Sequence, residues 1–114
     1  MADERASPRL TFHLFAPDCT DSECLSRRLA VRPQHLVEAA KVRHNVTLKV
    51  GGALLAPITE TEGGQKKMVG SMMLCEADCL EDVKAWVEED IYYTSNVWDK
   101  QKIVILPFVA AITN

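Results

Sequence analysis

The chain has 114 residues, of which 47% are hydrophobic and 25% charged, and its formal net charge is −3 at pH 7. This size and composition are typical of one globular domain. The acidic balance argues against nucleic acid as a partner, because phosphate binding needs clustered Lys and Arg. No apolar run approaches the roughly 20 residues that a membrane span requires.

We interpret residues 1–8 as a flexible polar tail and residues 9–114 as a single domain. The first residues lack the apolar core of a secretory signal, so we expect a cytoplasmic protein. Four cysteines, at positions 19, 24, 75 and 79, are spaced more widely than the pairs of structural zinc sites. We therefore predict free thiols that are buried or half-buried, and no metal.

A first strand is predicted over residues 10–16, where polar and apolar residues alternate, and it ends at Pro17-Asp18. Asp21-Ser22 are predicted to cap a short helical piece. Pro33 is predicted to open a second helix, because its missing N–H is one that a first helical turn leaves unpaired. His35 would then lie in that first turn, where the helix dipole disfavours imidazolium and favours the neutral ring of a general base.

The middle of the chain predicts strands at 50–57 and 68–75, joined by a hairpin with Gly63-Gly64 at its polar tip. Asp78 is predicted to cap a helix that closes within residues 88–93. A last strand is predicted at 103–106. The order β-α-β-β-α-β is that of the ferredoxin-like α+β fold, in which two helices cover one face of a four-stranded antiparallel sheet. The apolar face of the second helix is predicted to hold Leu80, Val83, Trp86 and Val87.

The second face of such a sheet is left open. We expect it to include Phe12 or His13, Leu55, and Met72 or Met73, which leaves apolar surface to be covered. Two sheets packed face to face would cover it, so we predict a homodimer. The methionines at 68, 72 and 73 are expected to pack at this interface.

The sequence resembles the YciI-like (YCII-related) family of small dimeric α+β barrel proteins over nearly all of its length after about residue 9. The most specific mark is the Arg-Pro-x-His-Leu element at residues 32–36. Two positions depart from the family's usual pattern, since Ile91 replaces a proline and Ala56 a glycine, and both changes concern the shape of the pocket. Further marks in chain order are Asp18, Asp21-Ser22, Gly70-Ser71, Leu80-Glu81, Ala85-Trp86, Asp90-Ile91-Tyr92 and Pro107-Phe108.

The resemblance implies a His/Asp active site. We predict that His35 and Asp18 form this pair, with the carboxylate fixing the tautomer of the ring and orienting its other nitrogen toward substrate. The alternative is that His35 only packs and Asp18 only ends a strand. Arg32 is predicted to bind a carboxylate or phenolate, or otherwise to form a salt bridge with Asp90. The resemblance also makes Asp90 a candidate second carboxylate of the pocket.

Three more side chains are candidates for binding substrate. His13 would line the pocket if its strand face points there, and Tyr92 and Trp98 would line a cleft for a planar ligand. The alternatives are an ordinary strand residue for His13 and simple packing for the two aromatic residues. His44 lies at a helix end and has little functional weight.

We predict a cofactor-independent acid/base enzyme, a lyase, dehydratase or isomerase, that acts on a small cyclic or phenolic molecule in catabolism or secondary metabolism. His35 would move the proton and Asp18 would orient it. The sequence carries no motif for a metal or nucleotide, so we expect no cofactor. Two alternatives are a non-catalytic dimeric binding or accessory protein and a cofactor-free oxygenase.

Overall fold

The computed structural model of the chain describes residues 9–57, 61–62 and 65–114. The predicted tail at 1–8 and the two glycines of the hairpin tip lie outside the described residues. A four-stranded antiparallel sheet in the order β2-β5-β1-β6 organises the domain, and a separate two-stranded ribbon pairs β3 with β4. The strands are β1 (Leu10–Pro17), β2 (Thr47–Leu55), β3 (Thr61–Glu62), β4 (Gln65–Lys66), β5 (Met68–Ala77) and β6 (Val104–Pro107).

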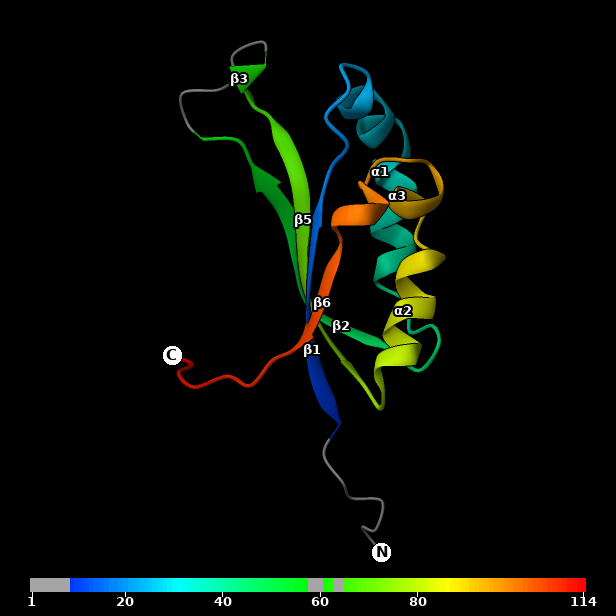
Figure 1. Cartoon of the computed structure of the whole chain (residues 1–114), viewed down its shortest axis with the longest axis vertical. Coiled ribbons are helices and arrows are strands. Elements are labelled where there is room, and N and C mark those ends of the chain that lie inside the picture. The colour runs from blue at the N-terminus through cyan, green and yellow to red at the C-terminus, as the bar shows by residue number, and fades with distance from the viewer. Residues whose placement is uncertain (1–8, 58–60, 63–64) are drawn as a thin grey trace, which may run out of the picture.

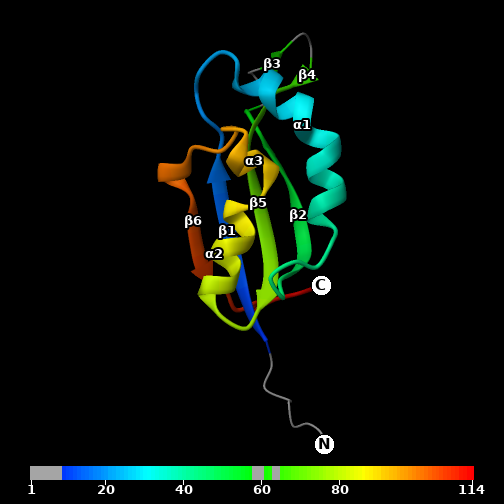
Figure 2. The same ribbon diagram turned by 90° about the vertical axis from the view of Figure 1, so that its right-hand side faces the viewer.

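The helices α1 (Cys24–Ala39), α2 (Leu80–Glu88) and α3 (Ile91–Thr94) lie on one face of this sheet (Figure 1), and a short 3-10 helix, η1 (Lys100–Lys102), precedes β6. Turning the molecule shows α1 along the side of β2 and α2 over β1 (Figure 2). This arrangement confirms the predicted ferredoxin-like α+β fold.

The core lies between the sheet and the helices. Along β1 the side chains alternate, so that Phe12 and Leu14 are buried under the helices while His13 and Phe15 lie on the open face. Of the two neighbouring methionines on β5, Met73 is buried in the core, and Met72 is half-buried on the open face. The helix α2 buries Val83, Trp86 and Val87 and packs Leu80 against them, as its periodicity predicts.

The helix α1 is continuous from Cys24 to Ala39, and Pro33 lies inside it. The prediction of two helices divided at Pro33 is wrong. A proline inside a helix removes only one backbone hydrogen bond, here to the carbonyl of Leu29. The helix buries side chains both before and after Pro33, and this packing keeps it continuous. His35 therefore lies about three turns beyond the helix start. The expected effect of the helix dipole on its ring does not apply, since that effect fades within the first turn.

Two predicted features of the second half also differ. Asp78 does not cap α2, since the N-cap residue is Cys79 and the Asp78 carboxylate accepts a hydrogen bond from Asn45 Nδ2 at 2.8 Å. The helix does not run on to residue 93 but ends at Glu88, and α3 starts separately with Asp90 as its N-cap. All four cysteines are free, two buried and two half-buried, as predicted. Among the described residues, no helix is long and apolar enough to cross a membrane.

Candidate active site

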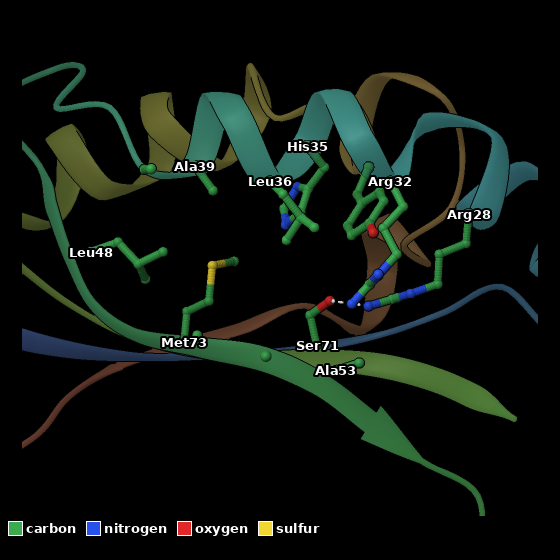
Figure 3. A pocket seen from close by; sticks show the side chains of 13 residues that line it. Arg28, Arg32, His35, Leu36, Ala39, Leu48, Ala53, Ser71 and Met73 are labelled. Atoms are coloured by element: carbon green, nitrogen blue, oxygen red, sulfur yellow. Dashed lines mark hydrogen bonds between the residues drawn. The ribbon is translucent and has the colours of Figure 1, made fainter. Parts of the chain in front are cut away.

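A cavity of about 150 Å³ opens between α1 and the β2–β5 half of the sheet (Figure 3). An apolar cavity of this size holds one benzene ring. Small residues line the cavity from both sides, namely Ala39 on α1 and Gly51 and Ala53 on β2. A Cβ added at Gly51 would lie 3.2 Å from the Met73 side chain. The lining residues are Arg28, Arg32, His35, Leu36, Ala39, Ala40, Leu48, Gly51, Gly52, Ala53, Ser71, Met73 and Tyr92.

The imidazole of His35 projects from α1 into this cavity. Its Nδ1 lies 2.9 Å from Asp90 Oδ1, and the same oxygen accepts a hydrogen bond from the backbone N–H of Tyr92 at 2.8 Å. A carboxylate only accepts hydrogen bonds, so this contact assigns the ring proton to Nδ1 and leaves the lone pair on Nε2. Both side chains are buried, with Asp90 only 4% exposed.

Two aromatic rings hold the imidazole in place. Tyr92 stacks on it with ring centres 3.8 Å apart, and Trp98 meets it edge-on at 6.3 Å. Burial raises the pKa of Tyr92 above its usual value of 10.0, although Arg28 and Arg32 oppose the shift. The phenol is therefore neutral at pH 7 and acts as a flat wall of the site.

Arg28 is the most deeply buried charge of the site, at 2% exposed. Its Nη1 donates to Asp18 Oδ1 at 2.8 Å, its Nη2 donates to Ser71 Oγ at 3.0 Å, and its Cζ lies 4.5 Å from the centre of the Tyr92 ring. Burial raises the pKa of Asp18, an effect only partly offset by the charge of Arg28. Asp18 thus neutralises Arg28 from behind the cavity wall and does not line the cavity.

The predicted contact between His35 and Asp18 is wrong, because Asp90 is the carboxylate at Nδ1 and Asp18 binds Arg28. The alternative salt bridge from Arg32 to Asp90 does not form either. Within the described part of the chain Arg32 makes no ion pair, and it lines the cavity as a candidate anion-binding group. His13 cannot line this cavity, because strand alternation places it on the opposite face of the sheet.

Tyr92 lines the cavity, whereas Trp98 lies behind it and supports Ser71 through an indole hydrogen bond of 3.1 Å. Sequence reasoning missed Arg28 and Ser71. A signal for Arg28 was present, since positions 28, 32 and 35 follow the i, i+4, i+7 spacing of one helix face. In the described residues, no group of three or more His, Cys, Asp or Glu side chains is placed to hold a metal ion.

Known proteins resemble this chain in sequence and in fold. The profile of the YCII-related domain matches residues 11–108. Protein YciI of Escherichia coli is 28% identical over 99 residues, which cover 87% of this chain and 96% of that protein. Fusaric acid biosynthesis protein 2 of Gibberella fujikuroi is 30% identical over 92 residues, which cover 81% of this chain and 86% of that protein.

A solved structure shares the fold at lower sequence identity. It is a 5-chloro-2-hydroxyhydroquinone dehydrochlorinase from Burkholderia phenoliruptrix in complex with 2,5-dihydroxybenzoquinone. The two structures superpose with a TM-score of 0.72 at 20% identity, over 90% of this chain and 96% of that one.

Proposed function

This chain belongs to the YCII-related domain family, and on that premise we propose that it is a cofactor-independent acid/base enzyme. It acts as a lyase, dehydratase or isomerase on a small cyclic or phenolic molecule. The observation that carries this proposal is the 2.9 Å contact between His35 Nδ1 and Asp90 Oδ1. The imidazole of His35 lines a cavity that is large enough for one six-membered ring. Asp90 replaces Asp18 as the carboxylate of the pair.

In the proposed reaction, Nε2 of His35 removes a proton from the bound ring, and Asp90 stabilises the imidazolium that forms. A base placed in this way contributes about 10²- to 10⁴-fold to the rate. Arg32 binds the oxygen on which negative charge develops, because it is the guanidinium of the cavity that has no carboxylate partner among the described residues. A leaving group then departs from the neighbouring carbon, or the proton returns at another position.

The substrate class rests on the cavity and on the related proteins. A volume of about 150 Å³ suits one six-membered ring. The structural neighbour is named for the removal of HCl from a chlorinated, hydroxylated ring, and a sequence relative is named for fusaric acid biosynthesis. The first name is consistent with a role in the catabolism of aromatic molecules, and the second with a role in secondary metabolism.

We further propose that the protein is a homodimer that forms through the open face of the sheet. The helices leave one side of the sheet uncovered (Figure 1). Strand alternation and pairing place Phe15, Val104 and Leu106 on that side, where they are 40%, 42% and 57% exposed. Contiguous apolar surface of this kind marks an interface. A second copy would cover it symmetrically.

The test is a turnover assay with a panel of chlorinated and hydroxylated hydroquinones. Turnover is measured as chloride release and as the absorbance of the quinone product. We expect the wild type to turn over at least one compound and His35→Gln to lose about 100-fold or more. His44→Gln is the matched control, because His44 pairs with Glu89 on the surface, at 2.9 Å. Full activity in His35→Gln would refute the base.

The same assay separates the alternatives. Tight binding of 2,5-dihydroxybenzoquinone without turnover of any compound would indicate a binding or accessory protein. Consumption of dioxygen during turnover would indicate an oxygenase.

A further inference from the structure

Ser71 lies on β5 in the sheet side of the cavity, where it is only 3% exposed. Its hydroxyl oxygen accepts two hydrogen bonds, one from Arg28 Nη2 at 3.0 Å and one from Trp98 Nε1 at 3.1 Å. A serine hydroxyl has two lone pairs to accept with and one hydrogen to donate. Guanidinium and indole N–H groups are donors only, so neither partner can accept this hydrogen.

The hydrogen of Ser71 is therefore free for a ligand. Within the described residues Ser71 makes no hydrogen bond as a donor, and its side chain belongs to the cavity wall. Buried hydroxyl groups normally have partners for their hydrogens. Acceptance from a charged guanidinium also polarises the O–H bond, which makes the hydroxyl a stronger donor than an isolated serine.

We propose that Ser71 donates this hydrogen to an oxygen of the bound ring. The ligand class is a cyclic molecule with a carbonyl or phenolate oxygen. Figure 3 shows Ser71 on the sheet and His35 on α1 across the cavity from it, so the ring lies between a donor and a base. This inference deepens the proposed function and rests on the same cavity. When His35 removes a proton, the electron pair of the broken C–H or O–H bond moves into the ring and onto the oxygen that Ser71 holds together with Arg32.

The test measures binding without turnover, so that its failure is distinct from a failure of the proposed reaction. Pentafluorophenolate and pentafluorobenzene have the same fluorinated ring and differ by one oxygen, and ¹⁹F NMR titration gives the Kd of each. We expect wild type to bind pentafluorophenolate more tightly. We expect Ser71→Ala to weaken it about 10- to 100-fold, because a charge-assisted hydrogen bond is lost, and to change pentafluorobenzene by no more than about twofold.

Two further variants separate binding from structure. Ser71→Thr keeps the hydroxyl and should stay within about threefold of wild type for pentafluorophenolate. Ser71→Cys is nearly the same size and donates weakly, so it should reproduce the loss seen in Ser71→Ala even if the alanine protein does not fold. Equal binding of the two ligands by wild type, or an equal loss for both in the Ala and Cys variants, would overturn the inference.

Discussion

The rings of His35 and Tyr92 lie 3.8 Å apart, centre to centre, and only 13° from parallel. Tyr92 also follows Asp90 by two residues, so its backbone N–H and the imidazole share one carboxylate oxygen. The tyrosine therefore sets the plane of the ring while the aspartate sets its rotation within that plane. A base that is fixed in both respects is held in one orientation toward the cavity.

Replacing Tyr92 should separate the stacked ring from its hydroxyl. Tyr92→Phe keeps the stacking, so its turnover should remain within about threefold of wild type. Tyr92→Leu loses the stacked ring and leaves space beside His35, so the free energy of unfolding should fall by about 1–3 kcal/mol. Because the base is then less well oriented, kcat should fall by a larger factor than any change in KM. Thermal unfolding and steady-state kinetics of the two variants check this. Equal kcat values for Phe and Leu would show that stacking does not position the base.

Asp90 serves both His35 and the start of α3, and two substitutions distinguish these roles. Asp90→Asn keeps an N-cap oxygen but removes the charge that stabilises imidazolium, so activity should fall about 10²- to 10⁴-fold with little loss of stability. Asp90→Ala should lose the cap as well, at about 1 kcal/mol. The matched control is Asp99→Ala, which removes the cap of η1 and should not affect turnover.

The sequence predicted the fold because alternation in β1 and helical spacing in α2 are local patterns. It did not predict the partner of His35. Asp18 and Asp90 are both acidic residues at the ends of elements, and which of them meets the ring depends on how α3 turns back toward α1. Asp90 has an extended backbone between two helices, with ψ of 139°, and only tertiary packing places that break beneath His35.

Arg28 was missed for a different reason. Dividing α1 at Pro33 hid the fact that Arg28, Arg32 and His35 share one helix face. Local rules give proline a large weight as a helix breaker, while the packing of a long amphipathic helix outweighs one missing hydrogen bond. The same packing decides that Ser71 points into the cavity, through the alternation that also buries Met73.

Pro33 should therefore make α1 less stable than it would be with another residue at this position. Pro33→Ala restores the N–H that can donate to the Leu29 carbonyl and removes the ring from the helix interior. A gain of about 1–2 kcal/mol is expected, because the helical penalty of about 3 kcal/mol exceeds the entropy that proline removes from the unfolded chain. Urea denaturation measures it. A loss of stability would mean that the residues around Pro33 have adapted to the proline ring.

Asp18 and Asp21 should make the free energy of unfolding change with pH in opposite directions. Burial raises the pKa of Asp18 above 3.8, so the folded state binds this proton more tightly and stability falls as pH rises from 3.8 through the folded pKa. Hydrogen bonds from Arg27 lower the pKa of Asp21 to about 2, so its contribution is present above 3.8 and is lost as pH falls toward 2.

Urea denaturation of wild type, Asp18→Asn and Asp21→Asn between about pH 2 and pH 7 would measure both effects. Relative to Asp18→Asn, wild type should lose stability as pH rises. Relative to Asp21→Asn, wild type should gain stability over the acid part of the range. Parallel curves for wild type and Asp18→Asn would show that the charge of Arg28 fully compensates the burial of Asp18.

If the proposed dimer is correct, one charged substitution on the open face should prevent dimerisation, because it occurs twice in the interface. Twofold symmetry places each substitution at the interface twice, so Phe15→Glu buries two carboxylates against apolar surface. Analytical ultracentrifugation should show a dimer for wild type and a monomer for this variant. Val37→Glu is the control, because Val37 is an equally apolar, 58% exposed residue on the helix side of the molecule, and its variant should remain dimeric. A monomeric wild type would refute the dimer. Dissociation by Val37→Glu alone would place the contact elsewhere than on the open face of the sheet.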